Sequence, residues 1–256
     1  MRQLIAESAT SVPAYVAASH VLRIVPLETP REPAPEYVIE RENYTVRVIR
    51  SSAQRARAGM LVERMYSWRG YHTDGVAGGR QDSSRITFEA SSESQLFGTL
   101  TLGLDSEDGL LADTLYEDEI DPFRRSGGKV CELSKFAVDP QHSSKEVMAS
   151  LIQLAHIHAR ILRQVTDAFI EVNPRHALFY ERMLGFRQIG TVRTCPRVDA
   201  PAVLLHLELA YMDEQIRKHT GSFDSRERSL YPYFLSIREG GTRGSSSDSD
   251  RIAQAA

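Results

Sequence analysis

The segment "KVCELSKFAVDP", Lys129–Pro140, has the composition of a buried strand but contains charged residues, and the fold prediction starts from it. Its surroundings predict a strand over Val130–Val138. Glu132 and Lys135 interrupt that strand, although a buried ion costs several kcal/mol unless it is paired. The carboxylate therefore needs either an ion-pair partner or a functional role.

Strand geometry restricts the partners that Glu132 can have. Alternation predicts two faces, with Glu132, Ser134 and Phe136 on one and Leu133, Lys135 and Ala137 on the other. Residues three apart in a strand point to opposite faces, which disfavours a direct ion pair between the side chains of Glu132 and Lys135. A nearby arginine is the alternative structural partner.

The residues that follow predict a parallel strand pair joined by a helix. Ser143 and Glu146 form an S-x-x-E capping box at the start of a helix over 143–163, whose apolar stripe includes His158 as a packed, hydrogen-bonded core residue. Residues 167–172 form a strand. The connection has room for a right-handed crossover, so this strand should run parallel to 130–138.

Capping residues mark the next helix. Asn173 is a good N-cap, Pro174 suits the first helical position, and Gly185 is the expected stop. Strands are expected over 186–191 and 202–210 as an antiparallel pair. Upstream, we expect strands over 44–50, 85–90 and 95–103, a helix capped by Ser51 or Ser52, and short helices within the acidic stretch 110–125. This order predicts an α/β fold with one mixed central sheet and flanking helices.

Composition sets the broad class. The chain has 256 residues, 41% of them hydrophobic, and a net charge of -3, which argues against nucleic acid as a partner. Two separated cysteines argue against a disulfide framework or a zinc site, and we expect no metal. No segment has the length of a membrane span, so we expect a cytoplasmic protein.

Low-complexity stretches suggest the domain limits. Three prolines in "ETPREPAPE" (28–36) read as a linker, so residues 1–38 are expected to be an N-terminal extension. Residues 39–236 should form the folded domain, and 237–256 a disordered tail. The aromatic segment 228–236 is expected to pack back on the domain.

Two stretches carry a family resemblance. "DAFIEVNPRHALFYERMLGF" (167–186) resembles the penultimate strand and following helix of GNAT acyltransferases, and "CELSKFAVDP" (131–140) resembles the E-L-S-R-F-A-V of bacterial acyl-homoserine lactone synthases. Together with "PRVDAPAVLLHLEL" (196–209), the chain looks like the N-acyl amino acid synthases of the FeeM type over residues 44–210. This resemblance implies a GNAT fold whose two parallel strands splay apart around an acyl-pantetheine thioester.

In that setting Glu132 is the candidate base. An amine attacks a thioester only after losing a proton, and a buried carboxylate with a raised pKa can accept it. Backbone N–H groups of 136–138 would stabilise the oxyanion. Tyr180, the candidate acid for the leaving thiolate, stands five residues before Gly185 where GNAT proteins have four.

Further residues are expected to bind substrates. Lys135 replaces the arginine of the lactone synthases, and "YSWRGYH" (66–72) resembles their substrate-lining segment. Arg175, in a first helical turn, suggests a nearby anion or a pair with Glu171. The expected binding residues are Arg69, Trp68, Ser134, Lys135, Phe136, Val138, Asn173, Arg175 and His176.

The donor is expected to be an acyl-phosphopantetheine thioester on acyl carrier protein, with no separate cofactor. The loop Gln141–Glu146 lacks the glycines that let GNAT proteins hold the pyrophosphate of coenzyme A. Lys145, Arg160 and Arg163 could contact the acidic carrier. The predicted function is N-acylation of a small amino acid. An acyl-CoA-dependent N-acetyltransferase and a catalytically idle acyl-binding module are the alternatives.

Overall fold

The computed structural model describes residues 14–17, 20–25, 36–71, 84–93, 95–224, 227–235 and 237–238. The strands are β1 (Ala14–Ala17), β2 (His20–Val25), β3 (Glu36–Glu40), β4 (Thr45–Val48), β5 (Arg85–Ser91), β6 (Leu96–Leu104), β7 (Val130–Val138), β8 (Asp167–Val172), β9 (Arg187–Gln188), β10 (Arg193–Cys195), β11 (Ala200–Glu208) and β12 (Ile237–Arg238). The α-helices are α1 (Ser52–Trp68), α2 (Asp113–Arg125), α3 (Lys145–His156), α4 (Pro174–Leu184) and α5 (Leu209–His219).

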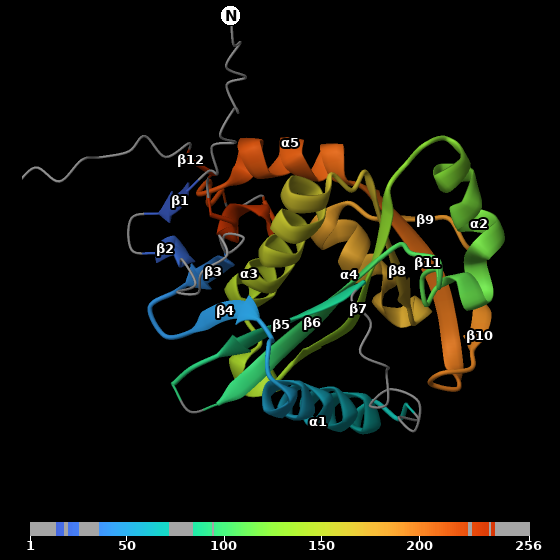
Figure 1. Cartoon of the computed structure of the whole chain (residues 1–256), viewed down its shortest axis with the longest axis horizontal. Coiled ribbons are helices and arrows are strands. Elements are labelled where there is room, and N and C mark those ends of the chain that lie inside the picture. Colours follow the sequence, from blue (N-terminus) through green and yellow to red (C-terminus); the bar gives the residue numbers. More distant parts are fainter. Residues whose placement is uncertain are drawn as a thin grey trace, which may run out of the picture.

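The described strands form one mixed sheet in the order β10-β11-β8-β7-β6-β5-β4-β3-β2-β1-β12, with β9 beside β11. Helices lie on both faces, so the predicted α/β class is confirmed (Figure 1). The helices α1 and α2 contribute to two small clusters on one face. The main core lies on the other face, beneath α3, α4 and α5.

The two faces of the central strands differ in polarity. Toward α3, strands β5 and β6 present Phe88, Leu100 and Leu102 to the main core. Toward α1 and α2, the paired positions carry Arg85, Gly103 and Glu132 in one row and Thr87, Thr101 and Ser134 in the next. Because successive side chains of a strand point to opposite faces, the alternating residues put the apolar side chains on the α3 face and the polar ones on the face of α1 and α2.

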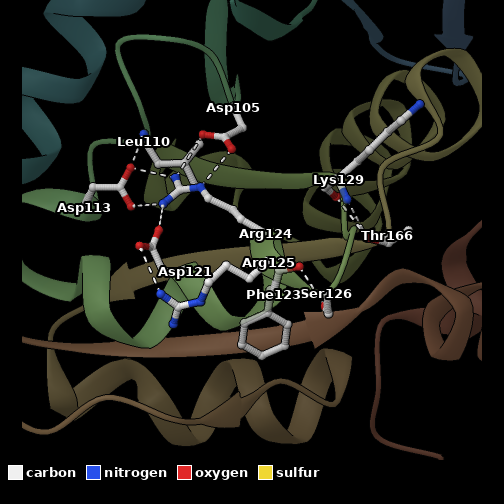
Figure 2. Close-up of polar contacts among 10 residues, drawn as sticks. All are labelled: Asp105, Leu110, Asp113, Asp121, Phe123, Arg124, Arg125, Ser126, Lys129 and Thr166. Carbon is white, nitrogen blue, oxygen red and sulfur yellow. Dashed lines mark hydrogen bonds and ion pairs between the residues drawn. The ribbon is translucent and has the colours of Figure 1, made fainter.

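Strands β7 and β8 are parallel and separate after three paired residues. Their pairing runs from Val130 opposite Asp167 to Glu132 opposite Phe169, and no further. Beyond this point β7 continues along β6, while β8 continues along β11 to Val172. The closed end is fixed by Thr166, whose hydroxyl accepts from the Lys129 N–H at 3.0 Å and donates to the Lys129 carbonyl at 3.1 Å (Figure 2). The predicted splay begins at Glu132.

A β-bulge interrupts β7 directly after the splay begins. Thr101 pairs with Ser134 and Thr99 with Ala137, so Lys135 and Phe136 together oppose Leu100. Lys135 has φ 51, in the left-handed region. The extra residue reverses the alternation, and Phe136 packs against the main core on the α3 face. The expectation that Phe136 shares a face with Glu132 and Ser134 is therefore wrong.

Helix α3 begins one residue later than its capping pattern predicted. Ser143 is the C-cap of a 3-10 turn at Pro140–His142, and Ser144 caps α3 by accepting the Val147 N–H at 3.2 Å. A π-helical turn, Ile157–Ile161, then extends α3. His158 lies in this turn with its ring against Phe88, but neither ring nitrogen has a hydrogen-bond partner among the described residues. The expectation of a hydrogen-bonded core histidine is thus wrong.

The remaining helix caps agree with the sequence. Ser51 and Gln54 form a capping box on α1, Asn173 caps α4, and Gly185 ends α4 with φ 84. Strand β11, however, ends at Glu208, and α5 begins where the strand pattern predicted continuation. Buried Leu209, Met212 and Ile216 in α5 have a helical spacing that was available in the sequence.

Segments near both ends join the folded body. Tyr37 and Ile39 of β3 are fully buried, so this strand crosses the expected boundary at residue 38. The segment 230–235 packs back on the domain as expected, since Leu230, Tyr231 and Phe234 belong to the main core. The domain limits themselves remain a prediction.

Candidate active site

A cavity of about 630 Å³ occupies the gap between β7 and β8. Its walls come from both strands beyond the splay, from α3 and α4 on one side, and from the end of α1 and the segment before α2 on the other. Because the two strands do not pair there, the cavity passes from one face of the sheet to the other. It therefore brings residues from both layers into one space.

The two ends of the cavity differ in chemistry. The end beneath α3 and α4 is apolar, lined by Leu100, Leu133, Met148, Ile152, Ile170, Leu184 and Phe186. The end toward α1 and α2 is polar, lined by Arg69, Arg85, Asp108, Glu132, Ser134, Lys135, Glu171 and Arg197. An apolar chain and a polar reactant can thus meet where the strands separate.

Glu132 lies at this junction and is only 3% exposed. Its Oε1 accepts from Arg85 Nη1 at 3.2 Å and its Oε2 accepts from the Ala112 N–H at 3.0 Å. Burial raises the pKa of Glu132, while the N–H groups of Leu111 and Ala112 and the charge of Arg85 oppose that rise. These contacts leave acceptor capacity on a carboxylate that also lines the cavity.

The sheet register explains how Arg85 reaches Glu132. Arg85 on β5 pairs with Gly103 on β6, and Gly103 pairs with Glu132 on β7. A Cβ at position 103 would lie 3.0 Å from Cγ of Glu132, inside normal van der Waals contact. The absent side chain of Gly103 therefore makes room for the ion pair above β6.

Arg124 fixes the segment that supplies the Ala112 N–H. Its guanidinium donates to Asp105 at 2.8 and 2.9 Å, to Asp113 at 2.7 and 3.0 Å, and to Asp121 at 3.0 Å (Figure 2). Asp105 and Asp113 stand on either side of Ala112 in the chain. The network thus ties α2 to the segment that precedes it and holds the Ala112 N–H near Glu132.

Tyr180 lines the cavity from α4 despite its shifted spacing. Burial raises the pKa of Tyr180. Burial also raises the pKa of Tyr66, at the facing end of α1, to about 12. Both phenols therefore remain protonated at neutral pH and can donate hydrogen bonds into the cavity.

The structure brings most of the predicted binding residues together. Those that line the cavity are Arg69, Ser134, Lys135, Phe136, Val138, Asn173 and His176. Asn173 also caps α4, its side chain accepting from the Arg175 N–H at 3.2 Å. Burial and then Arg175 lower the pKa of His176.

Trp68 and Arg175 are outside the cavity wall. Trp68, an expected binding residue, is 70% exposed and does not line the cavity. Arg175 is exposed and donates to the Tyr71 hydroxyl at 2.8 Å and to the Arg69 carbonyl at 3.3 Å. It joins the start of α4 to the end of α1 at the cavity, and the suggested pair with Glu171 is wrong.

Glu171 pairs instead with Arg197. Arg197 Nη2 donates to Glu171 Oε2 and Nη1 to the Leu111 carbonyl, both at 2.7 Å. Arg85, Arg197 and Glu171 had no local motif to mark them. Arg85 and Glu171 lie on strands of the sheet, and Arg197 lies in the turn between β10 and β11.

The three basic residues proposed for carrier contact do not form one patch. Lys145, at the start of α3, donates to the Arg228 carbonyl. Arg160, in the π-helical turn at the far end of α3, is bound to Asp213 at 2.9 Å. They therefore lie at opposite ends of the helix.

The described part of the chain has neither a clustered metal-ligand set nor a membrane-spanning helix. No group of three or more His, Cys, Asp or Glu side chains there is arranged to hold a metal ion. Within the same residues, every helix is too short or too polar to cross a bilayer.

Several solved structures are similar to this chain in fold. The structure of FeeM, an N-acyl amino acid synthase from uncultured soil microbes, superposes with a TM-score of 0.62 at 27% identity, covering 67% of this chain and 94% of that one. An N-acetyltransferase from Staphylococcus aureus gives a TM-score of 0.47 at 13% identity, covering 65% and 98%. Escherichia coli ElaA gives 0.48 at 10% identity, covering 64% and 99%. No curated protein matches the chain.

The family comparison covers more than half of the sequence. The profile of the family described as N-acyl amino acid synthase FeeM matches residues 57–208. That range includes most of α1, the splayed strands β7 and β8, and every cavity-lining residue named above. The chain therefore belongs to the FeeM family of N-acyl amino acid synthases and is an acyltransferase with the GNAT fold.

Proposed function

We propose that the protein transfers a fatty acyl group from the thioester of acyl carrier protein to the amine of an amino acid. The observation that carries this proposal is the position of Glu132, which is buried, lines the cavity and stands where β7 and β8 separate. A thioester in the gap would have its carbonyl beside this carboxylate.

The proposed reaction proceeds through a tetrahedral intermediate. The amine nitrogen attacks the thioester carbonyl carbon, and Glu132 accepts a proton from that nitrogen. The C–N bond forms, and backbone N–H groups within 136–138 stabilise the oxyanion. The C–S bond then breaks, and the Tyr180 hydroxyl supplies a proton to the thiolate. The products are the amide and the free pantetheine thiol.

The division of the cavity supports a fatty rather than a short acyl group. The wall beneath α3 and α4 is formed by aliphatic side chains and Phe186, and each methylene buried there gains about 0.8 kcal/mol. The polar end suits an amino acid. A short acetyl group would leave the apolar wall without a partner.

The loop between β7 and α3 supports a donor with a single phosphate. It contains no glycine, and His142 stacks on Phe97 with ring centroids 4.5 Å apart. Side chains there oppose the close backbone approach that a diphosphate requires. Supplying decanoyl carrier protein and decanoyl coenzyme A separately tests this preference, and equal turnover of both would contradict it.

Replacing Glu132 tests the proposed base. Glu132→Gln should lower acyl transfer by about 10²–10⁴-fold, because the amide cannot accept the proton. Amide formation is measured by mass spectrometry with decanoyl carrier protein and a panel of amino acids. Near-normal turnover of the variant would remove Glu132 from this role.

A matched control distinguishes the loss of a catalytic base from a general loss of stability. Glu89 is also buried on this face and accepts from Arg47 at 2.8 Å, but it does not line the cavity. Glu89→Gln should therefore retain turnover in the folded fraction. Equal losses in both variants would point to a structural effect.

A further inference from the structure

The polar end of the cavity carries more positive than negative side chains. Among its described lining residues, four are cationic (Arg69, Arg85, Lys135 and Arg197) and three are acidic (Asp108, Glu132 and Glu171). Two ion pairs, Glu132 with Arg85 and Glu171 with Arg197, account for two charges of each sign. Cationic side chains from four separate parts of the chain thus meet at this end of the cavity.

The β-bulge places Lys135 in this wall. A non-glycine residue in the left-handed region costs about 1–2 kcal/mol, and Lys135 has φ 51 there. The bulge brings a half-buried lysine to the cavity on the strand that carries Glu132. Burial and then the positive charge of Arg85 lower the pKa of Lys135, and both side chains line the same cavity.

Arg85 also connects this cationic pair to Glu132. Its Nη1 lies 3.2 Å from Glu132 Oε1, so an anion bound beside Arg85 and Lys135 would be a near neighbour of the proposed base. In an α-amino acid, a single carbon separates the carboxylate from the amine. One such molecule can therefore present its carboxylate to the cations and its amine to Glu132.

Ser134 adds a polar atom at the same place. Its Oγ is buried without a hydrogen-bond partner among the described residues, and Ser134 lines the cavity next to Lys135. A buried hydroxyl without a partner is costly, and a ligand oxygen would satisfy it. Arg197, farther along the cavity wall, donates to Glu171 and to the Leu111 carbonyl.

We propose that Lys135 and Arg85 hold the carboxylate of the acceptor and so restrict the enzyme to amines that carry an α-carboxylate. This inference rests on the proposed function, because the ligand is the acceptor of that reaction. Lys135 is then a specificity-determining residue, and the bulge is the backbone feature that delivers it.

Binding of two product-like probes tests the inference without turnover. N-decanoylglycine and N-decanoylglycinamide differ only in the carboxylate, and their affinities are measured by calorimetry. The native protein should bind the acid about tenfold or more tighter than the amide, as a charge-assisted contact predicts. Lys135→Met should reduce that ratio below about threefold, mainly by weakening the acid.

Three variants make the result specific. Lys135→Arg should keep the preference, and Lys135→Gly should lose it without backbone strain, because glycine favours the left-handed region. Lys129→Met removes an exposed positive charge just before the same strand and should keep the preference. An unchanged preference in Lys135→Met and Lys135→Gly, or none in the native protein, would overturn the inference.

Turnover separates this inference from the proposed function. Acylation of glycine and glycinamide at equal efficiency would overturn the carboxylate site while leaving N-acyl transfer intact. Failure to acylate any amine from carrier protein or coenzyme A would count against the proposed function, whereas the binding ratio of the two probes would still decide the role of Lys135.

Discussion

The carboxylate of Glu132 experiences two opposing influences on its pKa. Burial raises that pKa above the ordinary value of 4.5, while the N–H groups of Leu111 and Ala112 and the charge of Arg85 limit the rise. A base must be deprotonated to act, so turnover should fall as the pH is lowered through this raised pKa. The acid side of the pH–rate profile thus reports the environment of Glu132.

Replacing Arg85 should move that profile in a defined direction. Removing its charge in Arg85→Gln favours the protonated acid, so the pKa of Glu132 should rise further. The pH dependence of kcat at saturating acceptor measures this shift. An acid limb that stays in place or moves to lower pH would contradict it.

Gly103 offers a second test at the residue scale. A Cβ in Gly103→Ala would lie 3.0 Å from Cγ and 3.1 Å from Oε1 of Glu132, so the flexible side chain must move. We expect kcat to fall by about 10–100-fold, as small misplacements of a catalytic group can cause, with little loss of stability.

Gly59→Ala is its matched control. Gly59 lies in α1, and a Cβ there would meet nothing within 4 Å. This change should leave kcat unaltered and stabilise the helix by about 0.5–1 kcal/mol. Equal kcat values for the native protein and Gly103→Ala would show that the fit around Glu132 is not critical.

At the scale of elements, the approach of α2 to β7 depends on Arg124. This side chain is 22% exposed and binds three aspartates, whereas its neighbour Arg125 is 71% exposed and lies 3.9 Å from Asp121 (Figure 2). Surface pairs of the second kind contribute about 0–1 kcal/mol. The two adjacent arginines thus form a natural comparison.

Arg124→Met should destabilise the protein and lower its activity. Leaving three aspartates without their shared partner should cost about 2–4 kcal/mol, and the Ala112 N–H should lose its position beside Glu132. Denaturant unfolding and turnover provide the measurements. Arg125→Met should change stability by less than about 0.5 kcal/mol; similar losses for both would refute the special role of Arg124.

At the scale of the molecule, residues 230–235 complete the main core. Gln153 in α3 binds the Leu235 N–H at 2.9 Å and the Leu235 carbonyl at 2.7 Å, and the Tyr231 hydroxyl donates to the Leu184 carbonyl at 2.5 Å. These contacts hold the segment against α3 and α4, which form the apolar wall of the cavity. The segment therefore supports the site from behind.

Two phenylalanines test this support. Phe234 is 2% exposed and Phe223 is 69% exposed. Phe234→Ala should lower the free energy of unfolding by about 3–5 kcal/mol, and Phe223→Ala by less than about 1 kcal/mol. Denaturant titrations measure both, and a small effect for Phe234→Ala would show that the segment is not part of the cooperative core.

The sequence by itself determined the features that depend on neighbouring residues. Alternation, helical spacing and caps specified β7, α3, β8 and α4, because an N-cap such as Asn173 or a stop such as Gly185 acts within one helical turn. The crossover rule made β7 and β8 parallel. The family likeness lay in the same stretches, so Glu132 and Tyr180 could be chosen for the cavity wall.

The tertiary structure alone decided the features that join distant residues. The partners of Glu132 are Arg85 and the Ala112 N–H, 47 and 20 positions away, and no local pattern pairs them. The bulge that turns Phe136 to the α3 face of the sheet and leaves Lys135 in the cavity wall follows from the register of β6 against β7. Register and ion pairing are set by which strands meet, so only the folded chain determined the chemistry around the carboxylate.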